Sequence, residues 1–237
     1  MALPRPSDPI DETIDSLVYL AAKTNANPVT RVVSAEVWAI VDLLERTMAA
    51  VRAANRAEVV ARAVRDWEDE QGDVKNRDLR RAIGGLVGDR HFVVQRSYPQ
   101  GIKPEISPRG REQVVRLRDL STRIGEVLKS PELATDPKVG ELTALLNDGR
   151  ATITSLADHL DQVVKEWTEK LLARGEAADA SRFYREEAVA QAGVVLGKLR
   201  ALLGGSASEA LSYTMPSRTR SEPAEEPTPP SGGGTSI

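Results

Sequence analysis

The sequence lacks cysteine and has little histidine, and these two absences exclude several kinds of chemistry. Among 237 residues there is no cysteine, and the two histidines are His91 and His159. Disulfide bonds, thiolate nucleophiles and cysteine zinc sites are therefore excluded. Asp158 and Asp161 stand one and two positions from His159, so on a helix they point to other faces and form no metal cluster. We expect no metal and no cofactor.

Long apolar runs and catalytic motifs are also absent. No stretch approaches the roughly 18 consecutive apolar residues of a membrane-spanning helix, and the first residues lack the apolar core of a signal peptide, so we expect a cytoplasmic protein. The glycines at positions 84, 85 and 88 lack the spacing of a dinucleotide-binding loop. No serine stands in a nucleophile elbow, and no two carboxylates have the spacing of an acid and a base. We therefore expect that the protein is not an enzyme.

The charge that is present is unevenly distributed. The formal net charge is −3, yet residues 75–118 contain 11 Lys or Arg against 4 Asp or Glu. This segment carries +7 and the remainder carries −10. A concentrated positive charge favours contact with a polyanion, because binding to phosphates releases counterions. The alternative is that these arginines are ordinary solvated surface residues.

Three helices are predicted before the basic segment. Apolar residues recur every three or four positions in residues 10–23, 34–54 and 57–70. Residues 1–33 form a lead with the first short helix, and Ser34 is a good N-cap for the second. The third helix is predicted to point Val60, Val64 and Trp67 inward and to end in a polar stretch at 68–72.

Residues 75–118 change from helical spacing to two short extended runs and back to a helix, which is the order of a winged helix. Residues 75–89 have a helical apolar face. The following run, 91–96, is rich in strand formers, residues 98–101 (Tyr-Pro-Gln-Gly) favour a type I turn, and residues 102–106 fit a returning edge strand. Ser107 then resembles an N-cap with proline next to it. We predict a β-hairpin wing at 90–106 within a winged-helix domain of residues 34–130.

The step Ser-Pro-Arg-Gly-Arg-Glu at 107–112, after this basic hairpin, resembles the Thr-Pro-Lys-Gly-Arg-Glu step that leaves the wing in MarR- and PadR-type regulators. The resemblance covers about residues 57–125. In these regulators the helix before the hairpin reads the major groove of DNA, the hairpin tip touches the backbone, and helices at both ends of the domain usually form a dimer. The resemblance implies eight DNA-binding residues: Lys75, Asn76, Arg77, Arg80 and Arg81 on the helix, and Arg96, Tyr98 and Lys103 on the wing.

Residues 137–204 are predicted to form a long antiparallel helical hairpin. Apolar residues recur at steps of three or four from 142 to 171, Arg174-Gly175 resembles a helix stop, and residues 177–203 can fold back. The same apolar residues also fit a dimer seam, because periodicity alone does not name the partner. Residues 206–237 are rich in Pro, Gly and Ser at their end and are predicted to be a disordered tail.

These patterns together predict a mostly α protein in which a winged helix-turn-helix domain precedes the helical hairpin. The first expectation is a transcription regulator that binds duplex DNA through the helix 75–89 and the wing 90–106. Its expected partners are duplex DNA and a second copy of the chain. The alternative is a non-catalytic interaction or scaffold subunit, as in chromosome-organising or phage assemblies, that binds a helical protein partner through the hairpin. An enzyme of unrecognised type is a third hypothesis, and it would need a pocket with convergent carboxylates.

Overall fold

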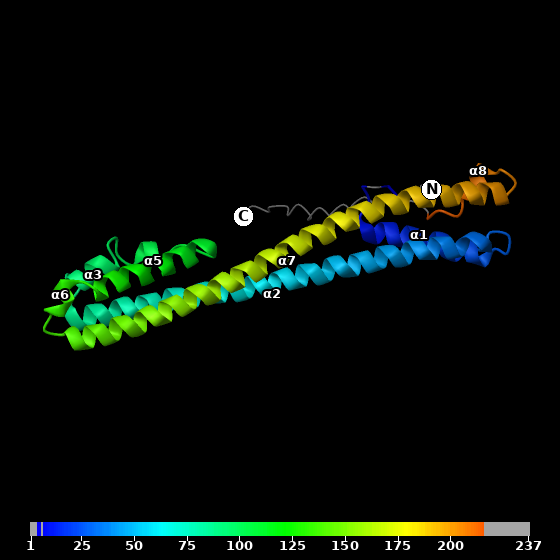
Figure 1. Cartoon of the computed structure of the whole chain (residues 1–237). Helices are drawn as coiled ribbons and strands as arrows, with labels where there is room; N and C mark the ends of the chain where they lie inside the picture. Colours follow the sequence, from blue (N-terminus) through cyan, green and yellow to red (C-terminus); the bar gives the residue numbers. More distant parts are fainter. Residues whose placement is uncertain (1–3, 6, 216–237) are drawn as a thin grey trace, which may run out of the picture. The chain divides into compact units, whose positions relative to one another are not determined.

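A computed structural model describes residues 4, 5 and 7–215, and every regular element in this part of the chain is a helix (Figure 1). The elements are α1 (Ile10–Ala26), the 3-10 helix η1 (Arg31–Val33), α2 (Ser34–Val87), α3 (Phe92–Ser97), α4 (Lys103–Ile106), α5 (Arg111–Leu128), α6 (Pro131–Ala134), α7 (Val139–Leu202) and α8 (Ala207–Leu211). The prediction of a mostly α protein is confirmed. The predicted wing is not, since the described residues contain no strand.

The chain divides into two compact units that share the long helices α2 and α7. Among the described residues, unit 1 comprises those up to Arg46 and those from Phe183 onward, and unit 2 comprises Thr47–Arg182. This division differs from the predicted boundaries at 33 and 130, because α2 runs from Ser34 to Val87 without a stop. The three helices predicted within 34–89 are therefore one helix.

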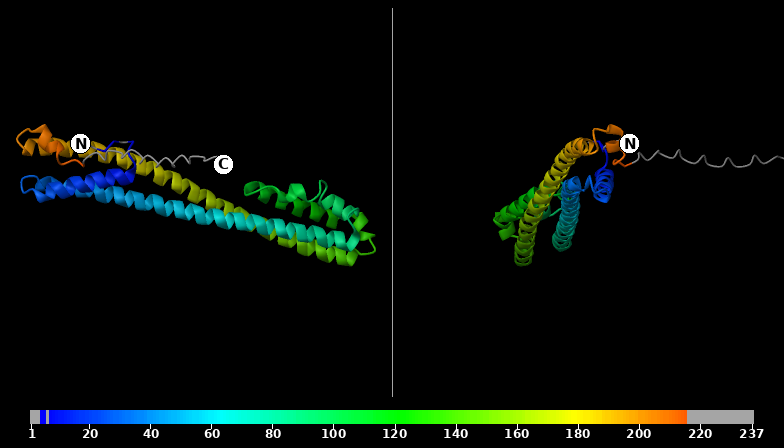
Figure 2. Two further views of the ribbon diagram at one scale, coloured as in Figure 1. Left: turned by 180° about the vertical axis from the view of Figure 1, so that it is seen from behind. Right: turned by 90° about the vertical axis from the view of Figure 1, so that its right-hand side faces the viewer.

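In unit 1, α1 lies beside the first turns of α2 and the last turns of α7 (Figures 1 and 2). Two hydrogen bonds fix the turn between α1 and α2: Ser34 Oγ donates to the carbonyl of Ala21 at 3.1 Å, and Thr30 Oγ1 donates to that of Thr24 at 3.0 Å. The core between these helices consists of aliphatic side chains, including Leu17, Leu20, Val37, Ile40, Leu44, Ala192, Val195 and Leu199.

The first residues of the predicted tail belong to unit 1. Ser206 accepts the backbone N–H of Glu209 at 3.2 Å and so caps α8. Tyr213 is buried, and Asn27 Nδ2 donates to its hydroxyl at 2.7 Å. The prediction of disorder from residue 206 is therefore wrong for 206–215, because this stretch forms α8 and buries Ala210, Tyr213 and Thr214, which helps to offset the cost of ordering it. The rest of the predicted tail, 216–237, lies outside the described residues.

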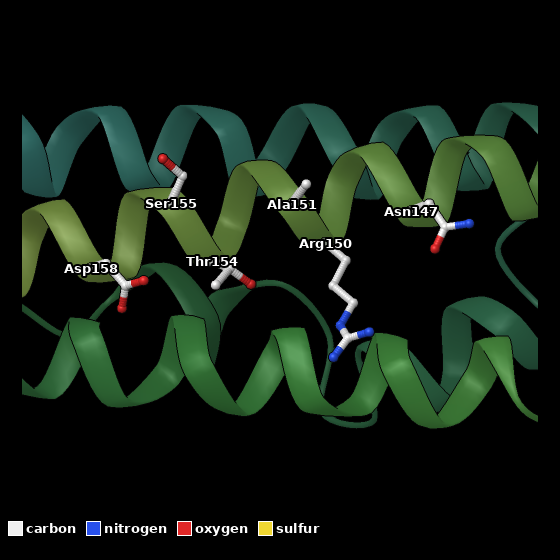
Figure 3. A pocket seen from close by; sticks show the side chains of 6 residues that line it. All are labelled: Asn147, Arg150, Ala151, Thr154, Ser155 and Asp158. Carbon is white, nitrogen blue, oxygen red and sulfur yellow. The ribbon is translucent and has the colours of Figure 1, made fainter.

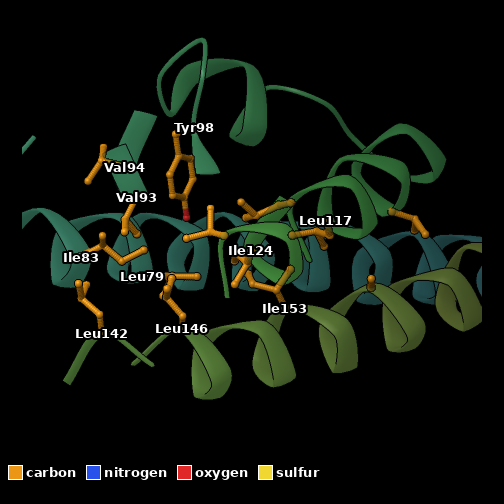
Figure 4. Close-up of a cluster of buried hydrophobic side chains, with 14 of the residues drawn as sticks. Leu79, Ile83, Val93, Val94, Tyr98, Leu117, Ile124, Leu142, Leu146 and Ile153 are labelled. Atoms are coloured by element: carbon orange, nitrogen blue, oxygen red, sulfur yellow. The ribbon is translucent and has the colours of Figure 1, made fainter. Parts of the chain in front are cut away.

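In unit 2, α2 and α7 pack antiparallel. The segment between them folds back, so that α5 lies along both helices (Figures 1 and 2). The three long helices enclose one apolar core (Figure 4). Its largest buried members include Ile83 of α2, Leu117 and Ile124 of α5, and Leu146 and Ile153 of α7.

The residues predicted to form the wing fold as α3, a turn and α4. His91 Nδ1 accepts the backbone N–H of Val93 and caps α3, whose buried face is formed by Val93, Val94 and Ser97. Packing of this face against α5 overrides the strand preference of the valines. The turn at Tyr98 is present as predicted, since the N–H of Gly101 donates to the Tyr98 carbonyl at 3.0 Å, but it joins two helices.

Two helix ends also differ from the predictions. The helix after the wing begins at Arg111 with Gly110 as its cap residue, rather than at Ser107. Farther along, α7 continues through Arg174 and Gly175 to Leu202. A single glycine inside a helix costs only about 1 kcal/mol, which its neighbours offset. The antiparallel packing of long helices is therefore present, but the partner of α7 is α2 and not a second half of the predicted hairpin.

Candidate protein-interaction surface

Three of the predicted DNA-binding residues lie exposed on α2. Lys75, Arg77 and Arg81 all point to solvent. Arg81 lies 3.6 Å from the carboxylate of Asp78, an exposed pair one turn away that holds the arginine only weakly. These three side chains are the part of the predicted recognition helix that a ligand can reach.

Two others on the same helix make internal contacts. Asn76 is fully buried, and its Nδ2 donates to the backbone carbonyl of Glu105 at 3.4 Å. Arg80 is half-buried and donates to the carboxylate of Asp89 at 2.8 Å. Asn76 therefore cannot touch a DNA duplex in this conformation, and Arg80 would have to leave its partner.

The predicted wing residues are divided in the same way. Arg96 of α3 forms a bidentate ion pair with Glu132 at 2.6 and 3.1 Å. The hydrogen bonds from Arg96 lower the pKa of the Glu132 carboxyl. Tyr98 is buried, and its hydroxyl donates to the carbonyl of Asn76 at 3.4 Å. Lys103 lies exposed at the start of α4. Of these three wing residues, Lys103 alone is both exposed and without an ion-pair partner among the described residues.

Acidic residues of α2 meet the start of α5 in a cluster that we call the polar layer: Asp69, Asp73, Arg109, Gly110 and Gln113. Arg109 is exposed, and the other four residues are buried. Both carboxylate oxygens of Asp69 accept the N–H of Gly110 at 3.0 Å. Asp73 accepts from Arg109 at 2.7 Å and from Gln113 at 3.0 Å. Burial raises the pKa of Asp69, and the hydrogen bond to Asp73 raises that of Arg109. The layer joins α2 to the cap of α5.

A second buried ion pair holds α4 against α5. Arg123 donates to the carboxylate of Glu105 at 2.7 Å and to the carbonyl of Ser97 at 2.9 Å. Burial and the nearby Glu105 raise the pKa of Tyr98. These charged groups are thus engaged in packing the segment between α2 and α7.

A polar hollow of about 550 Å³ lies beside α7 (Figure 3). It is lined by Asn147, Arg150, Ala151, Thr154, Ser155 and Asp158, all from this one helix. Arg150 reaches toward α5, where Gly125 leaves room for its guanidinium group. Asp158 pairs with Arg118 at 3.2 Å. The hollow therefore brings together no pair of carboxylates, and the described residues contain no cluster of three metal-binding side chains.

A second hollow, of about 420 Å³, is an apolar groove between α2 and α7 in unit 2. Its lining consists of Arg56, Ala57, Val60, Ala61, Val64, Val163, Glu166 and Lys170. Val60 is 63% exposed, Val64 is 45% exposed and the neighbouring Trp67 is 59% exposed. The prediction that these three side chains point inward is wrong. They are exposed apolar side chains of α2, as is the neighbouring Val59.

The exposed side chains follow a regular spacing. We call Ala53, Ala57, Val60, Val64, Trp67 and Val74 the apolar stripe. Its members stand alternately four and three residues apart, with Gln71 in the one polar position, which is the heptad spacing of a helix that packs against another helix. Glu58 lies about 200° around the helix from Val60. The apolar stripe and Glu58 therefore lie on different faces of α2.

Two side chains of α7 contact Glu58 and hold the two helices together. Trp167 Nε1 donates to Glu58 at 3.1 Å, and Arg174 lies 3.3 Å from the same carboxylate. The guanidinium group of Arg65 stacks over the Trp167 ring at 4.2 Å, a cation–π contact. These contacts, none of which involves a residue that lines the groove, hold α2 and α7 together in unit 2.

The described residues contain no helix that combines the length and the apolar character needed to cross a membrane. Comparisons of the chain with family models, with curated proteins and with solved structures found no match.

Proposed function

We propose that this protein is a non-catalytic interaction subunit that binds a helical protein surface through the apolar stripe. The observation that carries the proposal is the exposure of Val60, Val64 and Trp67 side by side on α2. Contiguous apolar side chains on the surface of a soluble protein mark a site for a partner. Tryptophan is also enriched in the energetically important centre of protein interfaces.

The surroundings of the stripe support a helix as the ligand. The heptad spacing places apolar side chains in a row along one side of α2. The groove beside α7 offers space into which the side chains of another helix would fit. Charged residues stand at the edges of the groove, with Arg56 on α2 and Glu166 and Lys170 on α7. An apolar centre with a charged rim is the usual layout of a protein interface.

This proposal is tested by site-specific photo-crosslinking in cells of the source organism. A photoreactive amino acid replaces Val60 in the full chain, and as a matched control it replaces Asp119, an exposed residue of α5. We expect a crosslinked protein at position 60 that is absent at position 119. The crosslinked protein is then purified, and we expect Trp67→Ala to weaken its binding by about 2 kcal/mol, or roughly 30-fold. Crosslinks that do not depend on the position would contradict the proposal.

DNA binding is a second candidate, supported by the exposure of Lys75, Arg77 and Arg81 on one helix. Binding through phosphates would weaken steeply with salt. The test is fluorescence anisotropy of a labelled duplex at about 50 and 200 mM salt, with the wild-type chain and with an Arg77→Ala/Arg81→Ala variant. Salt-sensitive binding that the variant loses would favour this function, and a flat signal for both proteins would exclude it.

A further inference from the structure

We infer that the helix which occupies the apolar groove is α2 of a second copy of this chain, antiparallel to the first and centred near Ala63. The inference rests on the proposed function, which requires a helical partner without saying which one. It is carried by two features of α2 within unit 2: the sizes of the side chains in the apolar stripe and the charges beside it.

The residues of the apolar stripe occupy two positions of the heptad. The stripe has one set of residues seven apart, Ala53, Val60, Trp67 and Val74, and a second set in between, Ala57, Val64 and Gln71. When two helices pack antiparallel in a coiled coil, each core layer takes one residue from each set. Two identical helices can therefore be paired so that both copies use the same contacts, as a two-fold axis requires.

The side chains in those layers are complementary in size. With the axis between residues 62 and 63, Val64 lies against the partner's Val60, and Ala57 lies against the partner's Trp67. The bulkiest residue of the stripe therefore meets one of the smallest, which is how closely packed cores fill space. A parallel pair would instead put both Trp67 rings in one layer and both Ala57 side chains in another, leaving one layer crowded and another empty.

The charged side chains beside the apolar stripe also match in the antiparallel pair. Arg56 and Glu70 are exposed, stand two heptads apart and are equally distant from Ala63. Neither makes an ion pair or a hydrogen bond within residues 4, 5 and 7–215. In the antiparallel pair, Arg56 of each copy faces the partner's Glu70, so the two opposite charges meet twice. Flanking charges of this kind select the partner and the orientation of a coiled coil.

The charge pattern allows an exchange experiment on the full chain. Sedimentation velocity over a range of protein concentrations gives the dimer dissociation constant of four proteins: wild type, Arg56→Glu, Glu70→Arg and the double variant. We expect a wild-type dimer, a weakening of about tenfold or more in each single variant, and recovery in the double variant to within about threefold of wild type. Circular dichroism checks that all four proteins remain folded.

A crosslink then locates the axis. Because the chain has no cysteine, Ala63→Cys introduces a unique thiol, and Asp119→Cys provides the matched control. We expect a short bismaleimide to join two copies through position 63 and not through position 119. Crosslinking through 119 alone, or through neither position, would show that any dimer uses another surface and would overturn the inference.

The remaining outcomes separate this inference from the proposed function. A wild-type chain that stays monomeric to about 100 μM, far above the dissociation constant of a specific complex, would overturn the second copy as partner. So would failure of the double variant to recover. If the photo-crosslink at Val60 still captured a different protein whose binding needs Trp67, the proposed function would stand with another partner. Loss of both signals would remove both.

Discussion

Gly149 of α7 and Leu79 of α2 lie so close together that a side chain at position 149 has no room. A Cβ added to Gly149 would lie 2.9 Å from Cδ2 of Leu79 and nearer still to Cδ1. Leu79 is itself buried in the core of unit 2 and cannot swing into solvent. The absence of a side chain at this one position therefore sets how closely α2 and α7 approach.

Replacing Gly149 with alanine should destabilise unit 2. We expect Gly149→Ala to lower the free energy of unfolding by about 1–3 kcal/mol, since overpacking forces buried side chains off their preferred rotamers. The measurement is urea unfolding followed by circular dichroism. Gly175, in the same helix with nothing within 4 Å of an added Cβ, is the matched control. Gly175→Ala should instead stabilise by up to about 1 kcal/mol.

A companion double variant checks the cause. If the clash with Leu79 is responsible, Gly149→Ala should cost less in a Leu79→Ala background than in the wild type. Equal costs in the two backgrounds would show that the residues are not coupled.

The cap of α5 should tolerate no side chain for a different reason. Gly110 has φ 59° and ψ −127°, a region that other residues rarely adopt. Gly110→Ala should cost about 1–3 kcal/mol of stability through backbone strain. Gly85, which lies inside α2 with open space around it, is the control, and Gly85→Ala should not destabilise. Equal unfolding midpoints for Gly110→Ala and wild type would refute the strain.

The buried carboxyl of Asp69 should make stability fall as pH rises. Burial raises its pKa above the unfolded value near 3.9. The folded protein therefore binds this proton more tightly than the unfolded chain, and stability decreases from about pH 4 up to the folded pKa, above which the effect is constant. Asp69→Asn can still accept the N–H of Gly110. We expect its free energy of unfolding, relative to wild type, to increase over this interval.

Asp161 provides the control with the opposite sign. Hydrogen bonds from Lys165 and Arg118 lower its pKa. Its contribution to stability is therefore present above the unfolded pKa and is lost as the pH falls through the folded pKa. Asp161→Asn should lose stability relative to wild type at neutral pH and not in acid. Parallel pH profiles for Asp69→Asn and wild type would count against the role of burial.

The buried carboxylate of Glu58 should be needed where α2 and α7 meet. Glu58→Ala leaves the indole N–H of Trp167 and the guanidinium group of Arg174 without their acceptor. We expect a loss of about 1–3 kcal/mol in urea unfolding. Glu169→Ala, at an exposed position of α7, is the control and should change stability by less than about 0.5 kcal/mol. A Glu58→Ala protein as stable as wild type would contradict this assignment.

The sequence predicted which segments outside the wing are helical, but not where the two long helices continue without a break or which helices pack together. Apolar periodicity located α1, α5 and the buried face of α7, because that spacing reflects burial of one side of a helix. It did not identify α2 as the helix against which α7 packs, because any apolar face fits the same pattern. The wing was predicted from Val93 and Val94, whose strand preference is weaker than the packing of α3 on α5.

The candidate surface shows the same limit more sharply. The spacing of Val60, Val64 and Trp67 correctly marks an apolar face, yet no pattern within one helix says whether its own chain covers that face. A signal was nonetheless present. Asp69 and Asp73 stand four residues apart on a different face of α2 from the apolar stripe. Either face could have been buried against the rest of the chain. In the structure the face with the two aspartates is buried and the apolar stripe is exposed.

That choice has a consequence for how α5 can move on α2. The polar layer pairs Asp69 with Gly110 and Asp73 with both Arg109 and Gln113. A shift of α5 by one helical turn, about 5.4 Å, would break all these pairs together and leave the buried carboxylates of Asp69 and Asp73 without hydrogen-bond donors. Apolar side chains alone would permit gradual slippage, whereas this contact allows a single register. These pairs therefore fix the position of α5 along α2.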